Sequence, residues 1–236
     1  MTKVHVLALG DFGVAVAEQL LREHDGVEVT SDRDSHQQFS AGWPQADVRV
    51  LVSWREAPHL AEILDARSAA WRTPWFPIVA EHPRLRIGPL VVPGAGACYR
   101  CFRKRRAQHE RDNAITASLH AHYDAEPAAG PEGFLPQHVS LAVGSVLDLL
   151  HRLEDDGGRR DAGTVRHWHL LEQLITSARV VGVHGCDRCR TNAGRNPAGS
   201  SWEDLANDLA PWFPATAPSA PGTAAEPAAP SIPARQ

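Results

Sequence analysis

The sequence predicts an α/β fold: a mostly parallel sheet with helices on both faces. Two observations lead to this prediction. Short apolar runs at residues 4–10, 47–53 and 75–80 have almost no polar interruptions, which is typical of strands buried on both faces of a parallel sheet. Segments with helical spacing of apolar residues separate these runs, as expected for βαβ units.

The first unit occupies the N-terminal thirty residues. Residues 4–10 read as a buried strand, and residues 10–13 as a turn. Apolar side chains then recur at helical spacing over 14–23, so we expect an amphipathic helix there. Gly26 stops this helix, and 27–30 forms the second strand. Together these segments make a βαβ unit of Rossmann type.

The chain continues with the same alternation. Residues 47–53 form the third expected strand. Pro58 stands where the first turn of a helix tolerates proline, so a helix should run from there to about Trp71. Residues 75–80 form a fourth strand and 85–92 a fifth.

The second half of the domain is more helical. A polar helix is predicted over 103–125, followed by a loop rich in proline, glycine and alanine at 126–133. The most apolar helix of the chain spans 137–153, and we expect it to be central. Two late strands are predicted at 165–171 and 174–183.

Composition divides the chain into three parts. Residues 1–192 form one domain, and the hydrophobic content of 43% is enough for a sizeable core. Residues 193–212 read as a linker with a short helix at 201–209. Residues 213–236 are dominated by Pro, Ala, Ser and Thr; such a segment buries too little apolar surface to offset its ordering entropy, so a disordered tail is predicted.

All four cysteines lie in two Cys-x-x-Cys pairs, Cys98/Cys101 and Cys186/Cys189. Two such pairs can present four sulfurs to one tetrahedral Zn²⁺. A four-thiolate shell leaves no open position, so the zinc would be structural. The alternatives are free thiols or two disulfides.

Charge and hydropathy exclude several classes of protein. The net charge of −4 argues against a dedicated nucleic-acid binder. No apolar run reaches the ~20 residues needed to span a bilayer, and no signal peptide is visible. We therefore expect a cytoplasmic protein, in a compartment where disulfides are disfavoured and zinc thiolates persist.

Two further groups are weaker candidates for binding sites. Arg103, Lys104, Arg105 and Arg106 form a basic run that could contact an acidic peptide, although a solvated helix face explains it equally simply. Gly10 and Gly13 follow the first strand, where a glycine turn can cradle phosphate; the alternative is a tight strand-to-helix turn. Asp32 or Asp34, after the second strand, could bind a ribose or be a solvated loop acid.

The order of these features resembles the ThiF-like branch of the ubiquitin-activating superfamily, over about residues 3–192. Within that branch the chain is most similar to the cyclodehydratase partner proteins of pathways that build azole rings into ribosomal peptides, such as bacteriocins and thiopeptides. The resemblance lies in the Rossmann-type start, the Gly88–Gly94 approach, Cys98–Cys101 with the arginines that follow, Val143–Ser145 on the long helix, and the distant pair Cys186–Cys189.

The resemblance also shows where this chain departs from adenylating members. Those members bind ATP with a glycine-rich loop, of which Gly10 and Gly13 remain while a third glycine is missing. Asp11 adds a negative charge beside the expected phosphates. Trp54 and Arg55 stand where the family places an aspartate that holds Mg²⁺, so the groups for nucleotide chemistry are incomplete. The resemblance therefore implies a catalytically silent subunit, with structural zinc and without ATP.

For function, the resemblance implies a partner protein that binds the leader of a precursor peptide and presents the peptide to a YcaO-type cyclodehydratase, which makes azoline rings from Cys, Ser or Thr. Exposed sheet edges offer one route to peptide capture, by strand addition. A homodimer is compatible with this reading; membrane and nucleic-acid partners are not expected. The first alternative is an active ATP-dependent adenylating enzyme, and the second is a nucleotide-sensing or NAD-binding module.

Overall fold

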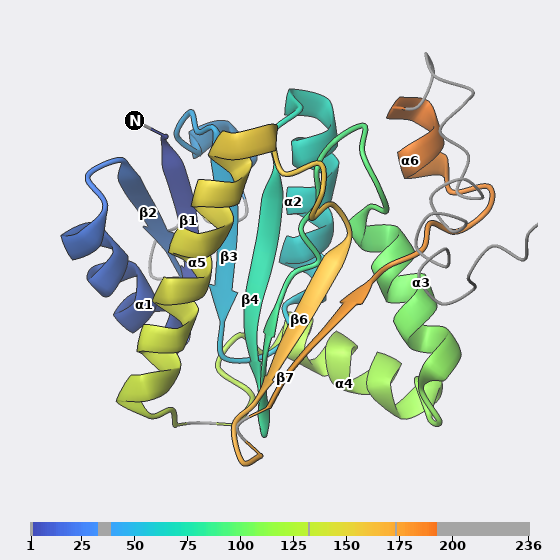
Figure 1. Cartoon of the computed structure of the whole chain (residues 1–236). Coiled ribbons are helices and arrows are strands. Elements are labelled where there is room, and N and C mark those ends of the chain that lie inside the picture. Colours follow the sequence, from blue (N-terminus) through green and yellow to red (C-terminus); the bar gives the residue numbers. More distant parts are fainter. Residues whose placement is uncertain (1, 33–38, 132, 173, 193–236) are drawn as a thin grey trace, which may run out of the picture.

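A computed structural model describes residues 2–32, 39–131, 133–172 and 174–192. The predicted linker, its short helix and the predicted tail, as well as Asp34, lie outside the described residues. The described chain folds around one sheet with the strand order β2-β1-β3-β4-β5-β6-β7 (Figure 1). The strands are β1 Val4–Leu9, β2 Val27–Ser31, β3 Val48–Ser53, β4 Trp75–Glu81, β5 Arg84–Ile87, β6 Thr164–His169 and β7 Leu174–Arg179.

The sheet is mixed, so the prediction of a mostly parallel sheet is correct only for its first half. β1 pairs in parallel with β2 and β3, and β3 pairs in parallel with β4. The pairs β4–β5, β5–β6 and β6–β7 are antiparallel. Short turns explain two of these pairs, because β4 is joined to β5 and β6 to β7 by a few residues only, and such brief connections require antiparallel neighbours. β5 and β6 are joined by a long connection that contains α3, α4 and α5.

Helices cover both faces of the sheet, as predicted (Figure 1). One core lies between the sheet and helices α1 and α5, and a second lies between the sheet and helices α2 and α3. Among the described residues, no helix combines the length and apolar character needed to cross a membrane. The helices are α1 Gly10–Glu23, α2 Pro58–Trp71, α3 Tyr99–His109, α4 Asn113–Ala125, α5 Pro136–Asp156 and α6 Asp187–Asn192, with a 3₁₀ helix at Ser40–Gly42.

Several boundaries differ from the predictions; the late strands predicted over 165–171 and 174–183 are Thr164–His169 and Leu174–Arg179. α1 begins at Gly10 itself, without a preceding turn. The single helix predicted over 103–125 is two helices, α3 and α4, and the Asn113 side chain accounts for the break by donating to the carbonyl of Ala107 at the end of α3 (2.8 Å). The strand predicted over 85–92 ends at Ile87 because Pro89 has no N–H to offer.

Candidate functional site: a cysteine cluster and the carboxyl edge of the parallel strands

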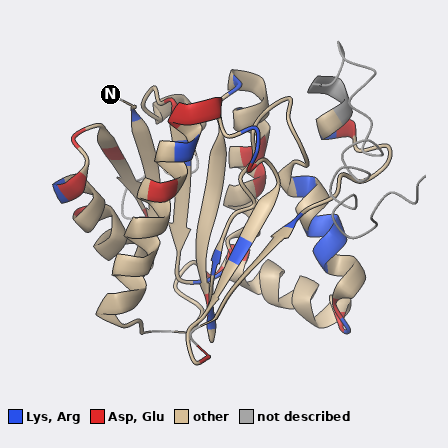
Figure 2. Ribbon diagram, in the orientation of Figure 1, with Lys and Arg blue, Asp and Glu red and all other residues tan. Residues whose placement is uncertain are grey.

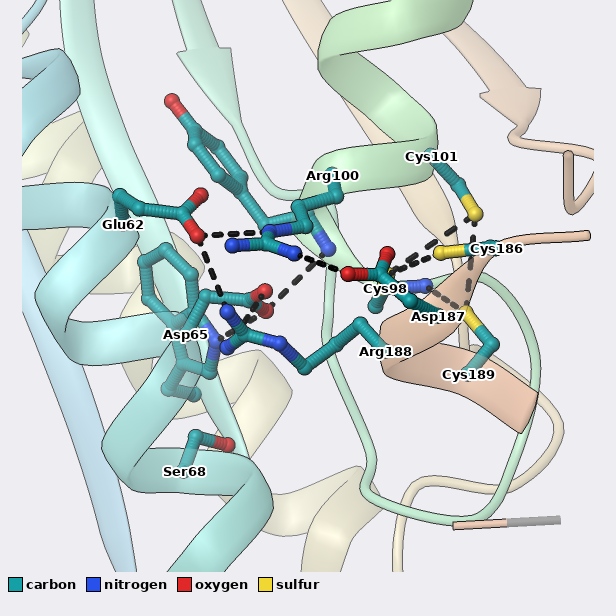
Figure 3. Close-up of polar contacts among 12 residues, drawn as sticks. Glu62, Asp65, Ser68, Cys98, Arg100, Cys101, Cys186, Asp187, Arg188 and Cys189 are labelled. Atoms are coloured by element: carbon teal, nitrogen blue, oxygen red, sulfur yellow. Dashed lines mark hydrogen bonds and ion pairs between the residues drawn. The ribbon is translucent and has the colours of Figure 1, made fainter. Parts of the chain in front are cut away.

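The structure brings all four cysteines together at one end of the molecule (Figure 3). Cys98 directly precedes α3 and Cys101 lies in its first turn; Cys186 and Cys189 have the same relation to α6. Each pair therefore places two sulfurs at a helix start, where backbone N–H groups favour thiolates. The two pairs meet because the chain leaving β7 runs back alongside α3.

The geometry of the four sulfurs fits a tetrahedral metal site. The Sγ–Sγ distances are 3.8 Å for Cys98–Cys101, 3.7 Å for Cys98–Cys186 and 3.5 Å for Cys101–Cys189. Zn–S bonds of about 2.3 Å in a regular tetrahedron put the sulfurs about 3.8 Å apart. A disulfide would need about 2.05 Å, so none of the four is oxidised here.

The electrostatics of the cluster also favour a cation. Hydrogen bonding between the Cys101 sulfur and the sulfurs of Cys189 and Cys98 lowers the pKa of Cys101 to about 2. The same contact raises the pKa of the Cys189 thiol to about 12. Metal binding requires deprotonated thiolates, and a divalent cation would allow all four sulfurs to ionise. Two backbone N–H groups donate to sulfurs of the cluster, from Cys98 to Cys189 and from Val183 to Cys101, both at 3.3 Å.

The residues between the cysteines anchor the cluster to α2 (Figure 3). Arg100 donates to Glu62 at 2.6 Å and to Asp187 at 2.7 Å. Arg188 pairs with Glu62 at 2.9 Å and lies 3.3 Å from the carboxylate of Asp65. These charged residues link both cysteine pairs to one helix of the Rossmann half, a role the sequence analysis did not foresee.

Asp65 is the buried member of this group, with a relative exposure of 1%. Burial raises the pKa of its carboxyl group, while the charge of Arg188 acts in the opposite direction. One of its oxygens accepts the backbone N–H of Tyr99 at 3.2 Å and the indole N–H of Trp75 at 3.4 Å. Asp65 therefore holds the start of α3 against α2, which fixes the position of the first cysteine pair.

The second candidate site is the edge of the sheet at the carboxyl ends of β1 and β3. In α/β sheets of this type, ligands bind where neighbouring strands are followed by connections in opposite directions, and β1 and β3 are such a pair here. Gly13 is needed for packing, since a Cβ on it would stand 2.7 Å from the carbonyl oxygen of Val52. Gly10, at the start of α1, has a positive φ of 63°.

Side chains of the chain itself fill this edge. The indole of Trp54 lies against Gly10 so closely that a Cβ there would collide with its ring. The Asp32 carboxylate accepts the backbone N–H of Gly10 at 2.7 Å. The structure thus brings Gly10, Gly13 and Asp32 to one edge of the sheet. However, the Asp32 carboxylate already accepts the Gly10 N–H that a phosphate would use, and the Trp54 indole covers Gly10.

Arg55 also covers the carboxyl ends of these strands. Its guanidinium is sandwiched between the rings of Trp54 (4.8 Å) and Tyr123 (4.4 Å). It donates to the carbonyls of Glu56 (2.8 Å), Tyr123 (2.9 Å) and Pro127 (3.0 Å). Arg55 therefore binds the loop after α4 over the strand ends instead of presenting its charge to a ligand.

The carboxylate nearest in sequence, Glu56, is also engaged. Its Oε1 accepts from Arg86 at 2.8 Å and from Arg106 at 2.6 Å. Glu81 accepts from the same two arginines, each at 2.7 Å. Burial alone would raise the pKa of Glu81, but the charges of Arg86 and Arg106 lower it far below its ordinary value. No sequence pattern marks this cluster, since its members come from separate elements.

The structure divides the basic run on α3 into two halves. Arg103 and Lys104 are exposed. Arg105 donates to the carbonyls of Val181 and Gly182, both at 3.2 Å, and holds the chain that leads to the second cysteine pair. Arg106 belongs to the ion-pair cluster just described. Figure 2 shows the basic residues as a blue stretch on α3, and of the four only Arg103 and Lys104 are exposed.

Comparisons with known proteins place the fold. The sequence matches no protein-family model and no curated protein. Among solved structures, the heterocyclase TruD is similar with a TM-score of 0.56 and 17% identity, over 80% of this chain and 27% of TruD. E. coli MccB, solved with MccA, has a TM-score of 0.55 and 14% identity, over 80% of this chain and 66% of MccB. A chain of the E. coli microcin synthetase McbBCD complex has a TM-score of 0.55 and 12% identity, over 78% of this chain and 67% of its own length.

Identities this low show a shared fold. The chain spans about a quarter of the heterocyclase TruD, and about two thirds of MccB and of the matched chain of the McbBCD complex. The described residues thus have the α/β fold that also occurs in TruD, in MccB and in the microcin synthetase complex, and they carry a four-cysteine cluster whose geometry can hold a metal ion.

Proposed function

We propose that this chain is a non-adenylating, ThiF-like partner protein in the biosynthesis of a ribosomally made, post-translationally modified peptide. It binds the precursor leader, presents the precursor to a YcaO-type cyclodehydratase, or does both. The observation that carries the proposal is the edge at β1 and β3, where Trp54, Arg55 and Asp32 take the space and the N–H group that a nucleotide would need. A fold shared with a heterocyclase and with microcin-related proteins supports the pathway.

An active adenylating enzyme is harder to reconcile with this site. Phosphoryl and adenylyl transfer depend on positioned phosphates and a metal held by carboxylates. Glu56, the carboxylate that follows Trp54 and Arg55, is paired with Arg86 and Arg106. An ATP complex would require Trp54 to leave Gly10 and Asp32 to release its N–H, so the chain would have to give up native contacts before it bound nucleotide.

The four cysteines supply the structural part of the proposal. Cys98, Cys101, Cys186 and Cys189 would hold one Zn²⁺ in a closed shell. When bound, the ion supplies charge neutralisation and a cross-link, and it offers no open position for substrate. Its task is to fix α3 and the chain beyond β7 to α2, so that the exposed face of α3 is presented in one orientation.

Arg103 and Lys104 are the proposed contact for an acidic partner surface. Arginine pairs with carboxylates in a bidentate manner, and both residues are exposed on a helix that the cysteine cluster anchors. Arg105 and Arg106 stay candidates on sequence grounds, but their internal bonds mean that reversing their charge would also disturb the fold.

The experiment is a pull-down with a YcaO-type enzyme and a candidate precursor peptide, chosen from the genes that neighbour the gene of this chain. We compare the wild type with the double variant Arg103→Glu/Lys104→Glu and with Arg22→Glu, which reverses an exposed cation on α1. The proposal predicts that the wild type and Arg22→Glu retain a partner and that the double variant binds more weakly. Failure of the wild type to retain either partner would reject the proposal; equal binding by the double variant would reject only this contact.

A further inference from the structure

A cavity outside the two sites described above lies at the start of α5. It has a volume of about 430 Å³ and is bounded by the β4–β5 turn, the end of β6 with the residues after it, and the first turns of α5. The backbone N–H of Leu170 donates to the carbonyl of Pro83 at 3.0 Å, which ties the segment after β6 to the β4–β5 turn. The volume is that of an ordinary small-ligand pocket.

The walls of this cavity are apolar and carry no fixed charge. Apart from Gln137 and three histidines, the described residues that line it are proline, leucine and tryptophan. Asp, Glu, Lys and Arg are absent from the described lining. The cavity therefore offers apolar surface to a ligand, but no formal counter-charge to an ion.

One of the three histidines, His169, is engaged elsewhere. Its Nδ1 lies 3.8 Å from the carboxylate of Glu172, and its Nε2 lies 3.3 Å from the hydroxyl of Thr176. Both nitrogens of this ring therefore have partners on the protein, and the polar groups available to a ligand come from the other two imidazoles.

Hydrogen bonds fix the tautomers of these two rings, His82 and His138, whose centroids are 5.9 Å apart. A carbonyl oxygen only accepts, so Nε2 of His82, which lies 3.2 Å from the carbonyl oxygen of Gly133, carries a proton. A backbone N–H only donates, so Nδ1 of His138, which accepts from Leu135 at 3.3 Å, carries none. In the neutral rings, the free positions are thus a lone pair on His82 Nδ1 and an N–H on His138 Nε2.

His138 is suited to remain neutral. Its relative exposure is 8%, and burial together with the charge that His82 can carry lowers the pKa of His138. Its lone pair is already used at the start of α5, so the two rings cannot both ligate a metal ion. Within the described residues, only the four cysteines bring three or more metal-ligating side chains together.

A donor beside an acceptor discriminates between classes of ligand. A carboxylate has acceptors only, so it would suit the N–H of His138 but face the lone pair of His82. An ammonium group has donors only, and the mismatch is reversed. A carboxamide is uncharged and presents a C=O and an N–H together, so it satisfies both rings without a counter-ion.

We propose that this cavity binds an uncharged amide that carries an apolar side chain, as an apolar residue within a peptide does. The amide oxygen accepts from His138 Nε2, the amide N–H donates to His82 Nδ1, and the apolar side chain lies among the leucines and Trp168. To identify that peptide with the precursor of the proposed pathway rests on the proposed function; the chemistry of the cavity does not.

The test compares three probes of different charge on the full chain, at about pH 7.5, where an ordinary histidine is neutral. N-acetyl-phenylalaninamide is uncharged, N-acetyl-phenylalanine is an anion and phenethylamine is a cation. Binding is followed by nitrogen-15 NMR of the indole and imidazole groups, with the Trp168 signal assigned from Trp168→Phe. We expect the uncharged probe to shift the signals of Trp168 and His138, and each charged probe to bind at least about tenfold more weakly.

Two variants locate the site. His82→Phe removes the acceptor and keeps an aromatic ring, so it should weaken binding of the uncharged probe about tenfold. Leu141→Trp fills the cavity and should abolish binding. The matched control is His151→Phe, which changes an exposed histidine of α5 and should bind like the wild type. His82 lies in an exposed turn, so His82→Phe still decides the matter where Leu141→Trp disturbs α5.

Each other outcome overturns the proposal. It fails if the uncharged probe does not bind, if a charged probe binds equally well, or if His82→Phe binds like the wild type. It also fails if the imidazole spectra show a proton on Nδ1 of neutral His82 or His138. The proposed function is judged separately: a precursor that binds the wild type and His82→Phe alike supports that function while rejecting the cavity as its site.

Discussion

At the scale of single residues, Trp54 decides how the β1–β3 edge can be used. The sequence shows that an indole and a guanidinium stand after β3 where a carboxylate is expected, and this much predicts a deficient nucleotide site. It does not show that the indole lies on Gly10 or that Asp32 takes the N–H of that glycine. Those contacts join segments far apart in the chain, and no local pattern encodes them.

The first prediction concerns ATP. We expect calorimetry to detect no ATP binding tighter than about 1 mM, which corresponds to about −4 kcal/mol, because binding would have to displace Trp54 and break the Asp32–Gly10 hydrogen bond. Trp54→Ala removes the first obstacle and Asp32→Asn weakens the second, so ATP affinity should rise only in these variants. Micromolar binding by the wild type would contradict the account.

The second prediction concerns His5, a fully buried residue of β1. Burial and the nearby charge of Arg49 lower the pKa of His5 to about 3. Below about pH 6.5, His5 is therefore protonated in the unfolded chain but stays neutral in the folded chain. The free energy of unfolding falls as the pH falls toward 3. Between pH 6.5 and 4.5 this one group should cost about 2 kcal/mol.

Urea unfolding at these two pH values checks this, in the wild type, in His5→Gln and in His59→Gln, a variant of an exposed histidine. The loss of stability on acidification should be smaller in His5→Gln by about that amount and unchanged in His59→Gln. Equal losses in all three proteins would show that His5 does not carry the effect.

At the scale of elements, α3 illustrates what periodicity alone misses. The run Arg103–Arg106 reads as one basic face in the sequence, yet its members have separate tasks in the structure. Helical geometry turns Arg106 inward to Glu56 and Glu81 and Arg105 to the chain after β7, and leaves Arg103 and Lys104 outside. The partners come from other elements, so the division is visible only once the elements are packed.

The third prediction follows from this division. Arg106→Gln leaves two half-buried carboxylates with one fewer cation, and we expect it to lower the free energy of unfolding by about 1–3 kcal/mol. Lys104→Gln changes an exposed residue and should stay within about 0.5 kcal/mol of the wild type. Denaturant unfolding of the two variants gives the comparison; a destabilisation of similar size in both would argue against the ion-pair cluster as a stabilising unit.

Unlike the division of the basic run on α3, the assembly of the two cysteine pairs was predicted from their spacing in the sequence alone. The fourth prediction is one Zn²⁺ per freshly purified, tag-free chain by metal analysis. Cys98→Ser or Cys189→Ser should lose the ion and much of the solubility. The ion cross-links residues 88 apart, as for Cys98 and Cys186, so by loop-closure entropy its loss should cost about 4 kcal/mol.

Chelation followed by zinc addition serves as the control, since it removes and restores the same cross-link without a substitution. The wild type should lose thermal stability with the chelator and regain it with Zn²⁺. Native protein without zinc that retains full stability would contradict the structural role of the site.

At the scale of the whole molecule, the first half of the fold follows from its sequence and the second half only in part. Continuous apolar strands and intervening helices predict β1 to β4 with their connections. The antiparallel order of β5, β6 and β7 depends on the pairing of Arg84–Ile87 with a strand some eighty residues later, and strand patterns do not reveal such pairing. That later half also carries the cysteine cluster.

We propose that this chain supports peptide cyclodehydration without activating the peptide itself. Mass spectrometry of the precursor peptide after incubation with ATP tests it most directly, with the YcaO-type enzyme and this chain added singly and together. We predict an unchanged precursor mass with this chain alone, and loss of one water per ring that requires or is strongly accelerated by both proteins together. An adenylated precursor formed by this chain alone, or ring formation by the YcaO-type enzyme at the same rate without it, would contradict the account.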